Sequence, residues 1–276
     1  MGDYLRPHRL KEALKALARP LTVLAGGTDF YPARVGRSID EDVLDITGIV
    51  ELRGITAGPD GWRIGATTTW SELLEADLPR LFDGLKQAAR EVGGRQIQNA
   101  GTIAGNLCNA SPAADGVPGL LALDAEIELA GRAGSRRVAL AEFITGNRRT
   151  TLAPGELVVA THVPRPVHPA HSAFLKLGAR RYLVISIVMA AATIEIADGK
   201  VARARVAVGA CSAVARRLPL LEAALAGAPV GPDLGNLVHP GHIGGLSPID
   251  DVRGSAAYRN EAAMVVLRRL LAGFSP

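Results

Sequence analysis

The stretch Ala25-Gly26-Gly27-Thr28-Asp29 decides how this sequence is interpreted. It comes directly after the apolar segment 21–25, which predicts a short strand. Two adjacent glycines let the chain turn sharply and present backbone N–H groups without obstruction by side chains, and Thr28 adds a hydroxyl donor. The stretch is neither a Walker A loop nor a Rossmann fingerprint, because both need further glycines or a lysine at fixed spacing. It therefore predicts a phosphate-binding turn of another kind, with an ordinary hairpin or tight turn as the alternative.

A second unusual segment, residues 93–115, contains glycines, asparagines and other small residues but few charges. An exposed linker would carry more lysine, glutamate and serine, so we interpret this segment as irregular backbone held close to a ligand. Its many neutral donors and acceptors suit a ligand with hydroxyl and phosphate groups, while a purely structural loop is the alternative. Two such segments in one region favour the ligand interpretation.

Together the two segments resemble the FAD-binding medium subunits of the molybdenum hydroxylases, the class that includes xanthine and carbon monoxide dehydrogenases. That family has an Ala-Gly-Gly turn near its N-terminus and, about 75 residues later, a Thr-Ile-Gly-Gly-Asn motif followed by Ala-Ser-Pro and Asp. Here the second motif reads Gly101-Thr102-Ile103-Ala104-Gly105-Asn106, and Ala110-Ser111-Pro112 and Asp115 follow it. Further matches are Val163-Pro164, Lys176 before Arg180-Arg181, and the segment 249–259, so that the likeness covers nearly the whole chain.

The resemblance implies an α+β fold, with a two-lobed FAD-binding domain of the PCMH type followed by a C-terminal α+β domain. Three prolines at positions 164, 166 and 169 indicate the boundary between them. We expect the FAD-binding domain over residues 1–168, with lobes of about 1–55 and 56–168, and the C-terminal domain over residues 169–276. Within these, residues 52–66 predict a hairpin, residues 69–76 a helix with a hydroxyl cap, and residues 255–270 a closing amphipathic helix.

The resemblance also implies which residues hold the cofactor. Residues 25–29 would bind the FAD pyrophosphate through backbone N–H groups, and residues 102–106 would support the flavin and the pyrophosphate. Asp115 would bond a cofactor hydroxyl, and Lys176 would favour the anionic reduced flavin through its positive charge. The full set of cofactor-binding residues expected on this basis is Val23, Leu24, Ala25, Gly26, Gly27, Thr28, Asp29, Phe30, Gly101, Thr102, Ile103, Ala104, Gly105, Asn106, Asp115, Val158 and Lys176.

Several of these residues have a simpler explanation. Asp115 could be only the N-cap of a helix that begins at Gly116, and Lys176 could be a surface lysine. Tyr182 could stack on the flavin or could be an ordinary core tyrosine. Ala104 stands where the family usually has glycine, which would cost about 1 kcal/mol if the backbone there needs a positive φ. We expect a slightly altered contact with FAD at this position, not its loss.

Composition excludes other kinds of site. The only two cysteines, Cys108 and Cys211, cannot supply the four ligands of an iron–sulfur cluster or a structural zinc ion. The histidine pairs 168/171 and 239/242 lack further ligands, so that no metal site is expected. The net charge of +4 is scattered, without the basic run that nucleic-acid binding needs. We find no nucleophile elbow and expect no catalytic acid or base in this chain.

The longest apolar stretch, residues 182–194, is too short to span a bilayer and is interpreted as a buried core element. No transmembrane segment is expected, and the N-terminus shows no signal-peptide core. Two isolated cysteines suit a reducing compartment, so we expect a cytoplasmic protein.

The function that the resemblance implies is that of an electron-transfer subunit in a heterotrimer. A large partner would carry the molybdopterin cofactor, a small partner would carry [2Fe–2S] clusters, and FAD on this chain would pass electrons to an external acceptor. One alternative is a stand-alone FAD-dependent oxidoreductase of the same fold group, which would need its own substrate pocket. Another is a scaffold that has lost FAD, against which the presence of both motifs argues.

Overall fold

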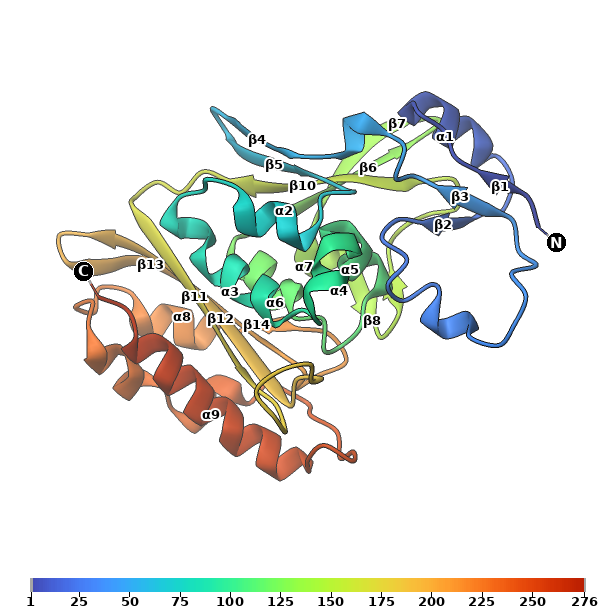
Figure 1. Ribbon diagram of the computed structural model, residues 1–276. Helices are drawn as coiled ribbons and strands as arrows, with labels where there is room; N and C mark the ends of the chain where they lie inside the picture. Colours follow the sequence, from blue (N-terminus) through green and yellow to red (C-terminus); the bar gives the residue numbers. More distant parts are fainter. Residues whose placement is uncertain (1, 276) are drawn as a thin grey trace.

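A small parallel sheet forms the N-terminal part of the computed structural model, which describes residues 2–275 (Figure 1). Its strand order is β1-β3-β2, with the bounds β1 Tyr4–Leu5, β2 Thr22–Leu24 and β3 Val43–Asp45. Helix α1 (Leu10–Ala16) joins β1 to β2 and buries Ala13. Because β2 is an edge strand that ends at Leu24, the glycine turn lies just beyond the sheet.

The second sheet is five-stranded and antiparallel. Its order is β4-β5-β10-β6-β7, with the bounds β4 Ile55–Gly58, β5 Gly61–Gly65, β6 Glu126–Gly131, β7 Gly134–Ala139 and β10 Leu157–Pro164. Strands β4 and β5 form the predicted hairpin. The turn requires Gly61, since its φ is +144° and a Cβ there would lie 2.1 Å from the carbonyl oxygen of Val163.

Short helices pack against this sheet, and all of them except the one at residues 95–100 contribute residues to the hydrophobic core that they share with it. They are α2 (Trp70–Glu75), α3 (Asp83–Glu91), α4 (Arg95–Ala100), α5 (Ile103–Asn109), α6 (Gly116–Ala122) and α7 (Leu140–Phe143). The predicted hydroxyl cap is confirmed: Thr69 Oγ1 accepts a hydrogen bond from Glu72 N, and Thr69 N donates to Glu72 Oε2 at 2.8 Å. A two-stranded ribbon of β8 (Ile144–Gly146) and β9 (Arg149–Thr150) leads back to β10.

The C-terminal part is a four-stranded antiparallel sheet with helices on both faces (Figure 1). Its strands are β11 (Ala170–Leu177), β12 (Val188–Ala197), β13 (Lys200–Gly209) and β14 (Arg216–Arg217). Helices α8 (Pro219–Leu225) and α9 (Ala256–Ala272) cover one face, while α3 and α6 cover the other. The predicted closing helix is thus confirmed and begins after the Ser255 cap, whose Oγ accepts from Tyr258 N at 3.2 Å.

Burial of both faces explains the apolar sequence of β12. Val188, Ala190 and Ala192 face the core beneath α9, while Met189 and Ala191 face a smaller cluster that includes residues of α3 and α6. Successive side chains of a strand point to opposite faces, so a strand covered on both sides has no polar alternation. The C-terminal sheet is therefore packed directly against the helices of the first part.

Two predictions about local structure are wrong. Residues 93–115 were expected to be irregular, but they contain α4 and α5. Gly94 is the N-cap residue of α4, and Thr102 is the N-cap residue of α5. Residues 182–194 were expected to be buried throughout, but Tyr182 is 62% exposed and burial starts only at Ser186. The described residues also form five 3₁₀ helices: Pro32–Arg34, Val50–Leu52, Arg80–Phe82, Pro232–Leu237 and Pro240–Ile243.

Candidate functional site

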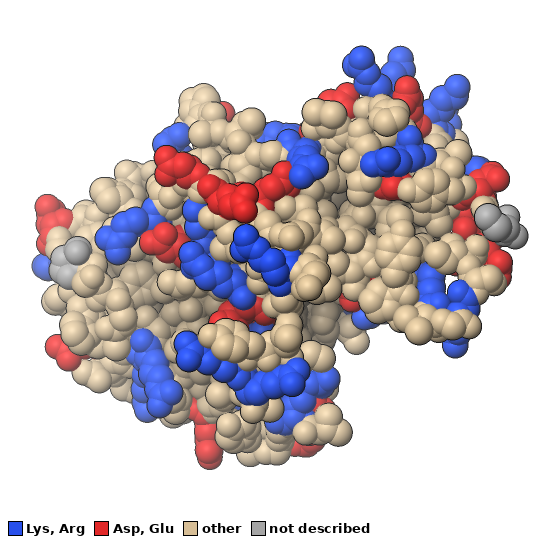
Figure 2. All heavy atoms as spheres, in the orientation of Figure 1, with Lys and Arg blue, Asp and Glu red and all other residues tan. Residues whose placement is uncertain are grey.

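A cavity of about 390 Å³ lies where the two glycine-containing segments meet. Figure 2 shows this face of the molecule hollowed between the N-terminal part and the remainder. All of the predicted cofactor-binding residues except Ile103, Asp115 and Lys176 line the cavity. Strand β10 contributes Val158, and residues 23–30 and 101–106 face one another across the space.

Close packing of backbone on backbone brings the two segments together. A Cβ on Gly26 would lie 1.9 Å from the carbonyl oxygen of Ala100, the last residue of α4. The next residue, Gly27, has a φ of +72°, which residues with a side chain rarely adopt. Gly26 is therefore needed for the approach to α4, and Gly27 for the turn itself.

The turn leaves backbone donors without partners. Within residues 2–275, the N–H groups of residues 26–30 make no hydrogen bond to protein, although the carbonyl oxygens of Gly27 and Asp29 accept from Tyr31 N and Ala33 N. Unpaired backbone N–H groups that follow one another in a turn form a concavity suited to an anion. The turn thus has the unpaired donors that an anion-binding turn needs.

The opposite wall is the start of α5. Thr102 caps this helix, because its Oγ1 accepts from Gly105 N at 3.0 Å, and Ile103 N donates to Thr68 O at 3.0 Å. Asn106 Oδ1 is buried and has no hydrogen-bond partner among the described residues. Buried acceptors are normally satisfied, so Asn106 Oδ1 is suited to accept a hydrogen bond from a ligand hydroxyl.

Trp70 forms the floor beneath both walls. It is 1% exposed, lines the cavity, and lies beside both Gly101 and Gly116. A Cβ on Gly116 would lie 2.4 Å from the Trp70 ring and 3.0 Å from Asn106 Oδ1. The absence of a side chain at Gly116 thus allows the indole and the Asn106 amide to lie side by side.

Asp115 and Lys176 form a buried pair beside the cavity rather than in its wall. Lys176 Nζ donates to Asp115 Oδ2 at 2.7 Å, and Ser186 Oγ donates to Asp115 Oδ1 at 2.6 Å. Burial raises the pKa of Asp115, although the ammonium of Lys176 and the Ser186 hydroxyl oppose this. The pair adjoins the cavity through Gly116, the neighbour of Asp115 that borders Asn106.

The simpler explanations for these side chains are wrong. Asp115 occupies the N-cap position of α6, but its side chain makes no capping hydrogen bond. The Lys176 side chain is 5% exposed and is no surface lysine. Tyr182 is exposed, so it is not a core residue. It also does not line the cavity, so the structure gives no support for stacking of Tyr182 on a ligand there. The side chain of Ile103 packs in the core at 1% exposure and does not line the cavity.

The cavity has further lining residues that the sequence did not indicate: Ile46, Ala66, Trp70, Val92, Ile97, Cys108, Asn109, Leu152 and Leu157. Most of them are apolar residues that a sequence pattern assigns to the hydrophobic core, so nothing in the sequence around them indicates that they line a cavity. Cys108 lies one helical turn after Ala104 in α5, lines the cavity and is exposed there. Loss of solvation beside the cavity walls raises the pKa of its thiol.

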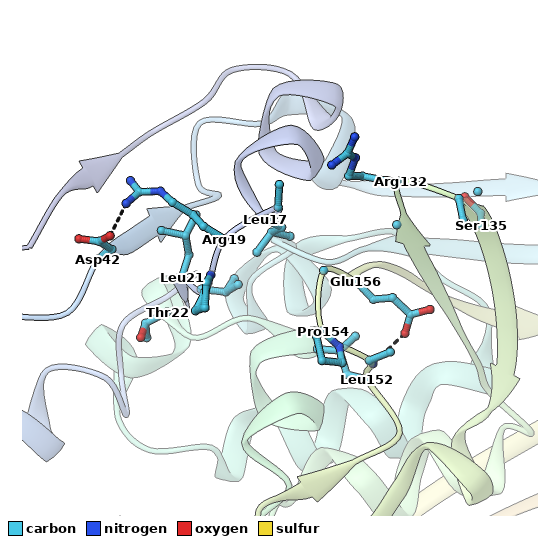
Figure 3. Close-up of a pocket in the computed structure, with 18 of the residues that line it drawn as sticks. Leu17, Arg19, Leu21, Thr22, Asp42, Arg132, Ser135, Leu152, Pro154 and Glu156 are labelled. Carbon is cyan, nitrogen blue, oxygen red and sulfur yellow. Dashed lines mark hydrogen bonds and ion pairs between the residues drawn. The ribbon is translucent and has the colours of Figure 1, made fainter.

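A second and larger groove of about 1270 Å³ lies between the segment before β2 and the β6–β7 hairpin (Figure 3). Of the predicted site residues it includes only Val23. Its charged residues are largely paired with one another: Arg19 pairs with Asp42 (Figure 3), and Arg136 pairs with Glu156. Because the unpaired donors and the orphaned Asn106 acceptor all lie in the smaller cavity, we regard that cavity as the candidate site.

Two kinds of feature are not found in residues 2–275. No helix there has the length and apolar character needed to cross a membrane. Nor does this part of the chain hold three or more His, Cys, Asp or Glu side chains grouped as a metal site.

Comparison with known proteins gives matches over nearly the whole chain. Residues 1–166 match the family described as FAD binding domain in molybdopterin dehydrogenase, and residues 173–273 match the CO dehydrogenase flavoprotein C-terminal domain. A putative xanthine dehydrogenase FAD-binding subunit of Escherichia coli K12 is 30% identical, with 98% of this chain and 96% of that one covered. The carbon monoxide dehydrogenase medium chain of Afipia carboxidovorans is 32% identical, with 97% and 94% covered.

The fold agrees with these matches. A chain of the reconstituted CO dehydrogenase from Oligotropha carboxidovorans superimposes with a TM-score of 0.87 at 28% identity, covering 98% of this chain and 96% of that one. The α+β fold with an FAD-binding domain and a C-terminal flavoprotein domain is thereby confirmed.

Proposed function

This chain belongs to the family of FAD-binding subunits of the molybdenum hydroxylases, and on that basis we propose that it transfers electrons between a partner's [2Fe–2S] clusters and an external acceptor. The observation that carries this proposal is the cavity in which the unpaired N–H groups of residues 26–30 face Asn106 across the floor formed by Trp70. Its relatives are subunits of dehydrogenases, so the chain belongs to an oxidoreductase as its flavoprotein subunit. We place its FAD-binding domain at residues 1–168 and the C-terminal domain at residues 169–276.

The residues of the cavity fit FAD. The row of unpaired N–H groups from residue 26 to residue 30 suits a pyrophosphate, and Asn106 Oδ1 lacks the hydroxyl that a ribityl or ribose group would supply. The cavity of about 390 Å³ is narrow and mainly apolar beyond these groups, as expected for a pocket that encloses part of an extended cofactor. Bound there, FAD would accept and release electrons.

The protein's own contribution is to bind and to tune. Residues 26–30 hold negative charge through backbone dipoles, and Gly27 keeps the turn in the conformation that presents them. Lys176 adds a positive charge next to the cavity, which favours the reduced anionic form of a flavin. Asp115 fixes the position of that ammonium group, because its Oδ2 accepts a hydrogen bond from Lys176 Nζ at 2.7 Å. Ser186 Oγ in turn holds the carboxylate by donating to Asp115 Oδ1 at 2.6 Å.

According to this proposal, a partner subunit binds the organic substrate. Carbon monoxide dehydrogenase and xanthine dehydrogenase act on unrelated molecules although their flavin subunits are similar to this chain, which supports a substrate site outside it. We propose a large partner with the molybdopterin cofactor, a small partner with the [2Fe–2S] clusters, and a cytoplasmic complex. The two cysteines of this chain cannot hold those clusters themselves.

Two measurements test the proposal. Flavin released by acid from the purified chain is identified by chromatography, and FAD, not FMN, is expected in the supernatant. The purified single chain is then mixed anaerobically with purines, N-heterocycles, aldehydes and carbon monoxide while flavin absorbance is followed, with dithionite as a control that the flavin can be reduced. We expect dithionite to be the only compound that reduces the flavin of the single chain. The organic substrates should reduce it only when both partners are present. Rapid bleaching of the single chain by a substrate would instead favour a stand-alone oxidoreductase.

A further inference from the structure

One arginine near the cavity has an unusual backbone conformation. Arg148 lies in the turn between β8 and β9, and its φ of +55° is in the left-handed region that residues with a side chain rarely adopt. A glycine would adopt this conformation without strain. Residues that keep such strain are concentrated at functional sites, which indicates that the Arg148 side chain has a role beyond forming the turn.

The turn is attached to the end of α5, next to the cavity. Arg148 N donates to the carbonyl oxygen of Ala110 at 3.0 Å, and Ala110 is the C-cap residue of α5 with a φ of +46°. The guanidinium donates through Nη1 to Oδ1 of Asn109, the last residue of α5 and one of those that line the cavity. The Arg148 guanidinium therefore lies one side chain away from the cavity.

Most of the hydrogen-bonding capacity of this guanidinium is unused. Arg148 is exposed, and within residues 2–275 it pairs with no carboxylate and only its Nη1 has a hydrogen-bond partner. By contrast, Arg136 donates to Glu156 through both Nε and Nη2. The donors of a guanidinium form a planar fork that matches two oxygens of a phosphate. Arg148 thus has Nε and Nη2 available for an anionic ligand.

The cavity itself has no positive charge to offer to a diphosphate. None of the residues that line it is a lysine or an arginine, and its one carboxylate, Asp29, has no cationic partner among the described residues. Lys176 lies beside the cavity but forms a neutral pair with Asp115. The N–H groups of residues 26–30 provide only the partial charges of backbone dipoles. A diphosphate in the cavity therefore needs a cation from its surroundings.

We propose that Arg148 binds the diphosphate of FAD, with Asn109 orienting its guanidinium. This proposal rests on the proposed function, since that function assigns the cavity to FAD. The hydrogen bond to Asn109 holds the side chain at the wall of the cavity, and the two unused nitrogens supply charge-assisted hydrogen bonds to phosphate oxygens. Arg148 is then a binding residue outside both glycine-containing segments, and the contact with phosphate offsets the strain of its backbone.

A purely structural role is the competing explanation, because a cation at the C-terminal end of a helix interacts favourably with the helix dipole. Arg148→Gly separates the two explanations, since it relieves the strain at a φ of +55° and removes the guanidinium. We expect the melting temperature of the FAD-free chain to rise by about 2 °C while FAD binds more weakly. A lower melting temperature with unchanged FAD affinity would show that Arg148 only stabilises α5.

A matched pair of substitutions tests the contact with the diphosphate. Arg148→Gln and Arg149→Gln each remove one exposed charge, but the side chain of Arg149 lies against Gly146, with its Cδ 3.7 Å from the Cβ position of that glycine. The full-length chain is freed of FAD and titrated with FAD and with ADP, which has the diphosphate but no flavin. Arg148→Gln should raise both dissociation constants about tenfold at low salt and less at high salt, while Arg149→Gln changes them less than about twofold.

Arg148→Lys keeps the charge and should retain most of the affinity that Arg148→Gln loses. Wild-type affinity for FAD in Arg148→Gln at low salt would overturn the proposal. Equal weakening in Arg149→Gln would do so too, since it would reduce the effect to general surface charge. The proposal also fails if Arg148→Gln weakens binding of FAD but not of ADP, because the contact would then lie away from the diphosphate. A wild-type chain that binds no FAD would instead contradict the proposed function.

Discussion

Lys176 and Asp115 form a buried ion pair of 2.7 Å that joins the C-terminal sheet to the start of α6. Breaking such a pair from one side leaves an uncompensated buried charge. Lys176→Met should therefore lower the free energy of unfolding by about 3 kcal/mol and shift the flavin midpoint potential to more negative values. Denaturant unfolding and redox titration measure the two effects.

The double variant Lys176→Met/Asp115→Asn is the control for this prediction. It removes both charges of a pair that is neutral overall, so most of the lost stability should return and the potential should move back toward that of the wild type. If Lys176→Met alone were as stable as the wild type, the ion pair would contribute nothing to the free energy of unfolding.

Gly27 supplies a test of the turn. Gly27→Val places a branched side chain at a φ of +72°, where its Cβ would lie 2.6 Å from the Tyr31 ring. FAD content should fall sharply while the remainder of the chain stays folded, as flavin absorbance per protein and circular dichroism would show. Gly36→Val is the matched control, because Gly36 has a φ of +75° but nothing within 4 Å of its Cβ position. Equal flavin content in the two variants would remove the role assigned to this turn.

Ala104 is the position where a glycine was expected. It lies inside α5 and is not among the residues with positive φ, so that its methyl group costs no backbone strain. Ala104→Gly should lower stability by about 1 kcal/mol, since glycine is unfavourable in a helix, and should leave FAD content unchanged. Thermal unfolding and flavin content decide the matter, and tighter FAD binding in the variant would contradict this account.

Cys108 reports on occupation of the cavity. Desolvation beside the cavity walls raises the pKa of its thiol, so alkylation by iodoacetamide at pH 8 should be slower than for a free thiol in water. Bound FAD should slow it further, because the thiol faces the cavity. A Cys211→Ser background makes Cys108 the only thiol that mass spectrometry can follow. Equal rates with and without FAD would show that the cofactor does not fill this part of the cavity.

Asp251 gives the turn before α9 a dependence on pH. The hydrogen bond from Arg253 N, together with those from Arg259 and Arg253 side chains, lowers its pKa to about 2. A carboxyl group with a lowered pKa stabilises the fold above its unfolded pKa of about 4, and this contribution is lost as pH falls toward 2.

The stability difference between wild type and Asp251→Asn should thus be full at pH 5 and shrink as pH falls toward 2. Unfolding by urea across this range measures it. Asp77→Asn, at an exposed residue, should show no comparable difference. A difference for Asp251→Asn that is constant with pH would mean that the carboxylate charge is not what holds Arg259.

Local chemistry made much of the site predictable from the sequence. The Gly26-Gly27 pair indicated a turn with free donors because only glycine combines close approach to Ala100 with a positive φ. The Thr69 cap and the hairpin closed by Gly61 are likewise set by neighbours in the chain. These features depend on backbone geometry within a few residues, which a sequence states directly.

Other features were decided only by the tertiary structure. Helix α5 has seven residues, too few to be stable alone, and it forms because Ile103 and Leu107 are buried in the shared core. Asp115 and Lys176 lie 61 positions apart, and no spacing rule predicts that β11 brings the ammonium group to the start of α6. Trp70 reads as a core residue and forms the cavity floor only because Gly101 and Gly116 leave room beside it. In each case the partner comes from a distant part of the chain, so packing of the whole fold, not local preference, determines the contact.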